Sequence, residues 1–163
     1  SRLSEYYNIN QSNVHAYVFG EHGDSSFIPW SVANISNVPI KECKKLITTP
    51  GINTPELDFG EIEQYVRKSG ARVIARKGAT FYAVSVSVCH ICKCLLGGID
   101  TTMTVSTMMH GEYGIEDVAL STLNMVGHNG VRGKVNVPMT DEEVTLLRKS
   151  ADTLKDVISN LEI

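Results

Sequence analysis

The 163-residue sequence lacks the signals that mark several classes of protein. No apolar run approaches the roughly 18 residues of a membrane-spanning helix, and no leader with a basic start and an apolar core is present. The 15 basic and 18 acidic residues give a net charge of −3, without the polybasic footprint of nucleic-acid or membrane binding. We therefore expect a cytoplasmic protein with no nucleic-acid partner and no membrane partner.

A dinucleotide-binding motif is missing as well. No Gly-x-Gly-x-x-Gly follows a predicted strand, and the nearest glycines, Gly127, Gly130 and Gly133, have the wrong spacing. In that motif the glycines let the backbone approach a pyrophosphate closely. The sequence therefore predicts no Rossmann domain. Its length suits a single domain, which buries roughly 70 % of its surface on folding.

Cysteines are few, but three of the four are clustered in Cys89-His90-Ile91-Cys92-Lys93-Cys94. Cys-x-x-Cys spacing is typical of zinc ligands, yet a second such pair and a His-x(3–5)-His pair are absent. We therefore expect no metal site, and we expect reduced cysteines that pack in the core as small apolar residues. A metal site made by Cys89, Cys92, Cys94 and His90 is the alternative.

A histidine lies in a glycine-bounded loop directly after an apolar segment. Residues 14–19 form a run of strand length, and Gly20-Glu21-His22-Gly23-Asp24-Ser25 follows. The glycines allow a tight turn and let another molecule approach the backbone. An imidazole gains and loses a proton near neutral pH, as general acid–base catalysis requires. The pattern predicts either a proton-transfer residue at His22 or a turn histidine with local hydrogen bonds.

Helices are predicted in the middle of the chain. The dense apolar residues of 26–35 favour a short helix, and Thr54-Pro55-Glu56 favours the start of a longer one with Gly70 as its weak point. Residues 81–96 begin with a strand-like alternation. Their apolar stretch is too long for a strand, however, and Gly97-Gly98 is a typical helix end, so we predict a helix.

The last third predicts antiparallel strands followed by a helix. Residues 101–109 alternate as a strand does, as do residues 131–137, and Asn129-Gly130 predicts a hairpin with positive φ at both turn residues. Thr140 and Glu143 form a capping box for an amphipathic helix. Its apolar stripe comprises Val144, Leu147, Ala151, Leu154, Ile158 and Leu161. The predicted fold class is α+β, an antiparallel sheet with packed helices.

Several segments resemble L-lactate dehydrogenases. The stretch 13–31 resembles the active-site segment of that family, and 77–82 resembles its substrate-threonine segment. Two later stretches, 104–107 and 113–118, resemble the strands that follow. These blocks keep the family's order, so residues 1–163 are similar to the C-terminal catalytic domain of a bacterial-type enzyme. The resemblance implies the fold of the lactate/malate dehydrogenase C-terminal domain, with the N-terminal Rossmann domain absent from this chain.

The resemblance also implies roles for particular residues. His22 would donate a proton to the carbonyl oxygen of pyruvate while NADH delivers hydride to the carbon, giving lactate and NAD. Thr80 would contact the substrate and Val84 would pack on the nicotinamide ring. Thr80 could instead cap a helix after Gly78, and Val84 could be a core residue. The resemblance assigns no role to Asp24, which we expect to structure the loop.

The family's assembly and regulation suggest further partners. His15 matches a histidine that, in allosteric members of the family, helps bind fructose 1,6-bisphosphate at a subunit interface. The alternative for His15 is a strand histidine without a regulatory role. Because family members assemble from several subunits, we expect a homo-oligomer. Other elements of the family's active site lie outside the matched segments, so we expect the isolated domain to be inactive. The alternative functions are a domain of a malate or 2-hydroxyisocaproate dehydrogenase, or a non-catalytic assembly module.

Overall fold

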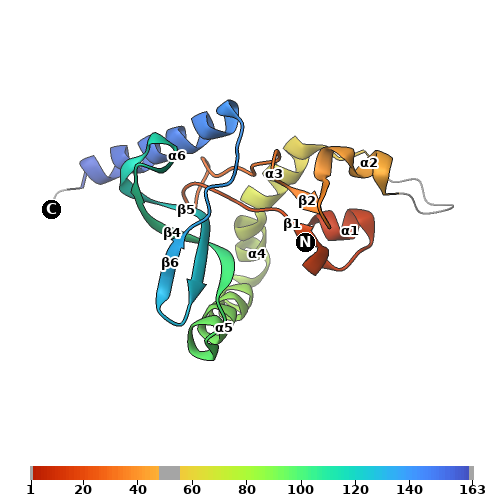
Figure 1. The fold of residues 1–163 in the computed structure, drawn as a ribbon, viewed down its shortest axis with the longest axis horizontal. Coiled ribbons are helices and arrows are strands. Elements are labelled where there is room, and N and C mark those ends of the chain that lie inside the picture. Colours follow the sequence, from red (N-terminus) through yellow and green to blue (C-terminus); the bar gives the residue numbers. More distant parts are fainter. Residues whose placement is uncertain (1, 48–55, 162–163) are drawn as a thin grey trace.

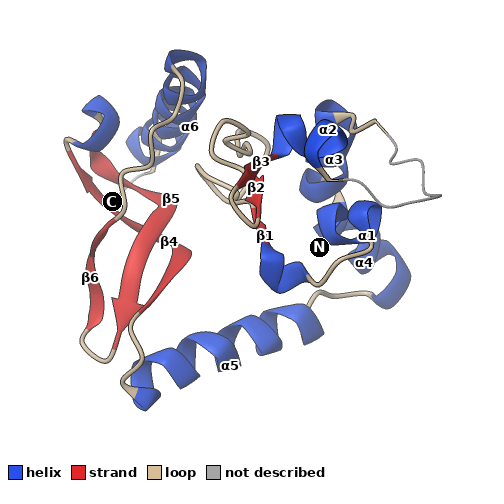
Figure 2. Ribbon diagram, turned by 45° about the vertical axis from the view of Figure 1, so that its right-hand side comes forward, coloured by secondary structure: helices blue, strands red, loops and turns tan. Residues whose placement is uncertain are grey.

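The computed structural model describes residues 2–47 and 56–161, which form two packed groups of elements (Figure 1). The first group comprises α1 (Arg2–Tyr7), β1 (Val14–His15), β2 (Asn34–Ile35), β3 (Val38–Pro39), α2 (Cys43–Leu46), α3 (Phe59–Arg67) and α4 (Ser69–Lys77). The second comprises β4 (Thr101–His110), β5 (Glu116–Gly127), β6 (Gly130–Lys134) and α6 (Asp141–Ser159). Helix α5 (Tyr82–Gly97) connects the two groups along one edge of the molecule (Figure 2).

Both sheets are antiparallel, which confirms the predicted α+β class. Strands β4, β5 and β6 are neighbours in that order, with Met103 opposite Asn124 and Asn124 opposite Lys134. The smaller sheet has the order β1-β2-β3. Helices α5 and α6 both pack against β5, and the consecutive residues Thr122, Leu123 and Asn124 are all buried, so both faces of the middle of β5 are covered.

Two apolar cores hold the groups together, and the segment after β1 contributes to both. Phe19 and Phe27 belong to a core shared with β4, β5 and α6, whereas Ile28 belongs to a core shared with α1, α2 and α3. Each buried aromatic or aliphatic side chain of this kind contributes on the order of 2 kcal/mol. The glycine-bounded loop between Phe19 and Phe27 is therefore fixed at its base by buried side chains.

The capping box of α6 is confirmed. The Glu143 backbone N–H donates to Thr140 Oγ1 (3.3 Å), and the Thr140 N–H donates to Glu143 Oε2 (3.0 Å). Leu147 and Ala151 are buried in the core, as the apolar stripe predicted, but Ile158 and Leu161 at the far end of the stripe are exposed. The stripe thus covers the sheet only along the first part of the helix.

The helix predicted over 26–35 is wrong. Phe27 instead forms a β-bridge with Phe19, a turn follows at residues 30–32, and β2 begins at Asn34. The apolar residues are dense there because they face two different cores, rather than one face of a helix.

The helix predicted from Thr54-Pro55 begins later. Thr54 and Pro55 lie outside the described residues, and α3 begins at Phe59, where Asp58 Oδ1 accepts a hydrogen bond from the Glu61 N–H (2.9 Å). The helical stretch is interrupted at Lys68 rather than at Gly70, because the chain turns there between α3 and α4.

Helix α5 is confirmed, including its end at Gly98, which has φ +65°. Its burial differs from expectation, because Cys94 is its one fully buried residue; Tyr82, Val86 and Leu96 are 68, 71 and 85 % exposed. Cys89 and Cys92 are exposed too, so the prediction that the cysteines pack in the core is correct for Cys43 and Cys94 and wrong for the other two.

The described part of the chain shows neither a membrane-spanning helix nor a cluster of metal ligands. None of its helices is both long enough and apolar enough to cross a lipid bilayer. Among the same residues, no three His, Cys, Asp or Glu side chains gather in a way that could hold a metal ion.

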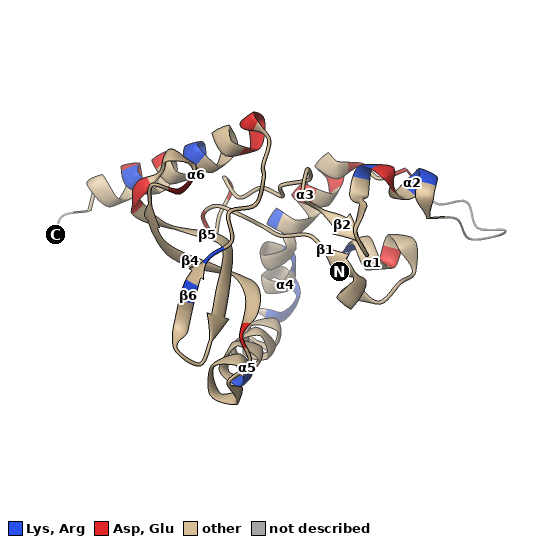
Figure 3. Ribbon diagram, in the orientation of Figure 1, with Lys and Arg blue, Asp and Glu red and all other residues tan. Residues whose placement is uncertain are grey.

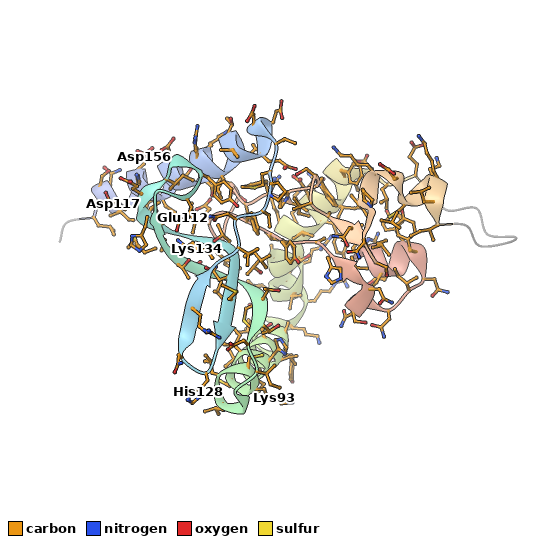
Figure 4. The ribbon with its side chains drawn as sticks, in the orientation of Figure 1. Lys93, Glu112, Asp117, His128, Lys134 and Asp156 are labelled. Atoms are coloured by element: carbon orange, nitrogen blue, oxygen red, sulfur yellow. The ribbon has the colours of Figure 1, made fainter. Side chains whose placement is uncertain are left out.

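The β5–β6 hairpin is confirmed, but its turn differs from the predicted one. His128 and Asn129 form the turn between the paired residues Gly127 and Gly130. Gly130 alone takes the left-handed conformation, at φ +80°, because the glycine follows the turn rather than occupying its centre. Figure 4 shows His128 beside the end of α5 that carries Lys93, and its Nδ1 lies 3.4 Å from the Leu95 carbonyl oxygen.

An ion pair joins the C-terminal end of β6 to the residues that follow the C-terminal end of β4. Lys134 Nζ on β6 lies 3.3 Å from Glu112 Oε2, just after β4 (Figure 4). The His110 backbone N–H also donates to this carboxylate (2.6 Å). The hydrogen bond from His110, together with Lys134, lowers the pKa of Glu112 below its ordinary value.

Candidate functional site

The glycine-bounded loop is closed at its base by two pairs of backbone hydrogen bonds. Phe19 and Phe27 exchange N–H···O bonds of 2.9 and 3.1 Å, and Gly20 exchanges two 3.0 Å bonds with Ser121 of β5. Both phenylalanines are buried. The chain therefore leaves the core at Phe19, forms the loop of residues 20–26, and returns to the core at Phe27.

Helix α6 anchors the start of the loop through a buried serine. The Ser150 side chain is fully buried, and its Oγ accepts a hydrogen bond from the Glu21 N–H (2.8 Å) and lies 2.9 Å from Ser25 Oγ. Gly20 has φ +100°, and a Cβ there would lie 2.6 Å from Ser150 Oγ. Glycine is thus required at residue 20 both by the backbone conformation and by the closeness of α6.

Glu21 organises the interior of the loop. Its Oε1 accepts hydrogen bonds from the Ser25 N–H (3.1 Å) and from Ser25 Oγ (2.7 Å). The role predicted for Asp24 is wrong, because Asp24 is exposed and makes no hydrogen bond within the residues that the structure describes. The longer Glu21 side chain spans the turn to Ser25, whereas the shorter Asp24 side chain is exposed to solvent.

Helix α3 holds the end of the loop. Arg67 Nε donates to the Ser26 carbonyl oxygen (2.9 Å), and Arg67 Nη2 pairs with Glu63 Oε2 (2.9 Å). Glu63 also accepts a hydrogen bond from Trp30 Nε1 (2.8 Å). The ion pair with Glu63 therefore also fixes the orientation of the Arg67 guanidinium that contacts the loop.

A second contact joins α6 to the segment that follows the loop. Both carboxylate oxygens of Glu143 accept hydrogen bonds from Ser31, one from its N–H (2.9 Å) and one from its hydroxyl. Glu143 thus has two functions, since its carboxylate accepts the backbone N–H of the N-cap residue Thr140 and also fixes Ser31. Together with Ser150, it attaches residues 20–31 to α6 at two points.

His22 projects from this anchored loop into solvent. The imidazole is exposed and makes no hydrogen bond to any residue in the described ranges. It lines a hollow of about 390 Å³ with Thr104, Ser106 and Ser121 of the larger sheet. It also lines a second hollow, of about 320 Å³, together with Arg67 and Gly70.

The other predicted site residues lie outside these two hollows. Thr80 is exposed in the segment before α5, and Val84 is 54 % exposed in the first turn of α5. His15 is exposed at the end of β1, opposite Asn34. Thr80, Val84 and His15 line neither of the two hollows beside His22.

This arrangement can transfer a proton to a molecule held beside His22. An exposed imidazole on a rigid loop, next to hollows lined by hydroxyl groups, has the acid–base chemistry and the room for a small polar substrate. Sequence reasoning missed Ser150, Arg67 and the second function of Glu143. No local signal could have revealed Ser150, because 129 residues separate it from Glu21.

Comparison with known proteins gives an independent view of the same chain. The sequence model of the lactate/malate dehydrogenase α/β C-terminal domain matches residues 1–162. L-lactate dehydrogenase of Acetivibrio thermocellus is 39 % identical over 99 % of the chain, and that of Thermoanaerobacterium saccharolyticum is 40 % identical over 99 %. The chain spans about half the length of these curated relatives, 50 and 51 % respectively.

Solved structures agree with the sequence comparison. An L-lactate dehydrogenase from Clostridium thermocellum superimposes with a TM-score of 0.85 at 36 % identity, covering 99 % of this chain and 51 % of the other. A minor L-lactate dehydrogenase from Enterococcus mundtii superimposes with a TM-score of 0.87 at 28 % identity, covering 99 and 50 %. The similarity thus extends across both packed groups of elements.

Proposed function

The chain belongs to the lactate/malate dehydrogenase family, as an α/β C-terminal domain, and from this premise we propose that it is the catalytic half of an NAD-dependent L-lactate dehydrogenase. The observation that carries the proposal is the exposed His22 on a loop that α6, α3 and β5 hold in place. The reaction is the reduction of pyruvate by NADH to lactate, and its reverse. The isolated domain is inactive, because a hydride donor must be positioned against the substrate.

His22 acts as the acid in this reaction. Adding a hydride to a ketone develops negative charge on the carbonyl oxygen, and an adjacent protonated imidazole stabilises that charge and then transfers its proton. In the reverse direction the neutral imidazole accepts the hydroxyl proton of lactate. The loop contributes precision, since a fixed backbone limits the positions that the His22 ring can take.

We assign Thr80 to contact with the substrate and Val84 to contact with the cofactor. NAD supplies the hydride when it is bound, and the half-exposed Val84 side chain offers an apolar surface that fits one face of a nicotinamide ring. The Thr80 hydroxyl can donate and accept hydrogen bonds, as contact with a carboxylate-bearing substrate requires. Both residues are open to solvent, so a second domain or a ligand can reach them.

A chimera tests the proposal. The first half of the Acetivibrio thermocellus enzyme, joined to this chain, would supply what the C-terminal domain lacks, and NADH oxidation with pyruvate is followed by absorbance. We expect activity in the chimera and none in the chain alone. His22→Ala should lower kcat by about 10²- to 10⁴-fold, the usual contribution of a general acid.

His110→Ala is the matched control, since it removes an exposed imidazole from β4, away from the loop. It should leave kcat within about twofold of the parent, as surface substitutions do. A folded chimera that binds NADH but shows no His22-dependent turnover would refute the proposed catalytic role.

The proposal also covers how the protein assembles, what regulates it and where it is located. We assign a homo-oligomer in the cytoplasm, with His15 contributing to a fructose 1,6-bisphosphate site between subunits. The exposure of His15 at the end of β1 supports this placement, because a second subunit can reach it. Activation of the chimera by fructose 1,6-bisphosphate, and its loss in His15→Gln, tests the assignment.

A further inference from the structure

A third hollow, of about 390 Å³, lies on α3 and α4 and shares no lining residue with the two hollows beside His22. Its wall contains three cationic side chains, Arg72, Arg76 and Lys77, together with Tyr65 and Ser69. No carboxylate lines it in the described part of the chain. A hollow of this volume is within the usual range for small-molecule sites, roughly 300–1,000 Å³.

The part of the sequence that forms this hollow has an excess of positive charge. Between Glu63 and Asp100 the sequence contains no acidic residue, although the whole chain has a net charge of −3. The basic residues of this stretch are Arg67, Lys68, Arg72, Arg76, Lys77 and Lys93. Figure 3 shows the corresponding blue segments on α4. Two acidic residues near this stretch in the structure are already paired, since Glu63 pairs with Arg67 and Glu5 pairs with Arg2, whose guanidinium lies over the Tyr65 ring.

Arg72 is held in a defined position before any ligand binds. Its guanidinium carbon lies 3.6 Å from the centroid of the Tyr65 ring, and its Nη2 donates to the Tyr65 carbonyl oxygen (2.7 Å) and to Ser69 Oγ (3.0 Å). These contacts use one edge of the guanidinium and leave its other N–H groups for a ligand. A preorganised arginine loses less entropy on binding than a mobile one.

Arg76 and Lys77 are the uncommitted charges of the hollow. Among the residues that the structure describes, Arg76 has neither a hydrogen bond nor an ion pair, and Lys77 has one contact, with the Tyr82 ring at 5.4 Å. Three like charges lining one hollow repel one another, so an anion bound between them would relieve that repulsion.

We propose that the hollow lined by Arg72, Arg76 and Lys77 binds a small phosphorylated metabolite that carries two or more negative charges. Arginine forks match phosphate oxygens in pairs, and lysine adds a point charge. Arg72 and Arg2 lie over the Tyr65 ring, so the ring is not free to stack on a base. The site therefore recognises the phosphate groups rather than a nucleobase.

The test uses the full chain and inorganic pyrophosphate as the probe. Calorimetric titration at low salt should show saturable binding with a dissociation constant below about 1 mM. Affinity should fall as salt is added, because charge pairing dominates. Citrate, a carboxylate of similar charge, should bind more weakly, and ADP should bind no more tightly than pyrophosphate.

Arg76→Gln/Lys77→Gln is the main variant, since these side chains make no hydrogen bond within the described ranges and the protein should still fold. Removing both should weaken pyrophosphate binding about tenfold or more, the effect of losing charge-assisted hydrogen bonds. Lys45→Gln/Lys149→Gln changes the net charge equally at exposed positions on α2 and α6, and should change affinity less than about twofold. His22→Ala should bind like the parent, which separates this site from the catalytic loop.

Thermal unfolding of each variant shows that the comparison is made between folded proteins. An equal loss of affinity in the two double variants would overturn the proposal, because binding would then follow net charge alone. Absence of saturable binding to the parent would overturn it as well. Tighter binding of a single-stranded oligonucleotide than of pyrophosphate would reassign the surface to nucleic acid and refute the small-ligand site.

Discussion

Replacing Ser150 by alanine should loosen the glycine-bounded loop of residues 20–26 from α6. The serine hydroxyl is fully buried, accepts the Glu21 N–H at 2.8 Å and lies 2.9 Å from Ser25 Oγ. Alanine fits the helix equally well but offers no acceptor. The Glu21 N–H would then remain unpaired at a part-buried position where water has limited access.

The expected cost is about 2 kcal/mol in the free energy of unfolding. An orphaned buried donor costs about 1–3 kcal/mol, and the better helix propensity of alanine returns about 0.5 kcal/mol. Ser25 Oγ keeps its bond to Glu21 Oε1 (2.7 Å), so the second lost contact adds little. At about 2 kcal/mol per molar urea, the unfolding midpoint should fall by about 1 M.

Equilibrium urea unfolding measures this shift, and Ser159→Ala in the same helix is the matched control. Ser159 is exposed and bonds within its own helix end, to the Asp156 carbonyl oxygen (2.9 Å), so its loss should cost less than about 0.5 kcal/mol. Hydrogen exchange should also show faster exchange of the Glu21 amide in Ser150→Ala. If both variants had the same midpoint, the reasoning that α6 anchors the loop would be refuted.

Three further outcomes follow from the same structure. Gly20→Ala should lower the unfolding free energy by about 2–4 kcal/mol in urea titrations, because Gly20 has φ +100° and the new Cβ would lie 2.6 Å from Ser150 Oγ. A loss of unfolding free energy below about 0.5 kcal/mol would contradict this prediction. After brief alkylation, mass spectrometry should find the exposed Cys89 and Cys92 modified. Cys43 and Cys94 should stay unmodified until denaturant is added, because both are buried and burial also raises the pKa of Cys43. Rapid labelling of Cys43 in the folded protein would contradict this prediction. The lowered pKa of Glu112 means that its stabilising effect is present above the ordinary glutamate value of 4.5 and is lost as pH falls through the lower folded value. Glu112→Gln should therefore flatten the acid side of the curve of stability against pH, and an unchanged acid side would count against the contacts of Glu112 with His110 and Lys134.

Signals confined to a few neighbouring residues predicted their elements well. Thr140 and Glu143 marked the start of α6, and Gly98 marked the end of α5, because a capping box and a left-handed glycine act through bonds within one helical turn. The hairpin was predicted too, although its turn residues were not. In the hairpin, one glycine satisfies either of two turn geometries, and the strand pairing decides between them.

Predictions of burial failed where a neighbouring element decides the outcome. Residues 26–35 are apolar because they contribute to two separate cores, which no single period reveals. Cys89, Cys92 and Cys94 lie in one six-residue stretch of the sequence, yet of these three only Cys94 is buried. Which side of α5 is covered depends on the direction in which the helix crosses β5, a matter of tertiary packing.

The candidate site shows the same division between sequence and tertiary structure. Sequence patterns alone indicated the family, from segments spread along the chain, and the α+β class, from the alternating strands and the capped helix. They also indicated the catalytic candidate His22, because acid–base chemistry needs an imidazole and a tight loop needs its glycines. Only the tertiary structure decided what holds that loop: Ser150, Arg67 and Glu143 come from helices distant in sequence, and their bonds exist only after both cores have packed. Local chemistry names the reactive group, whereas long-range packing fixes its position.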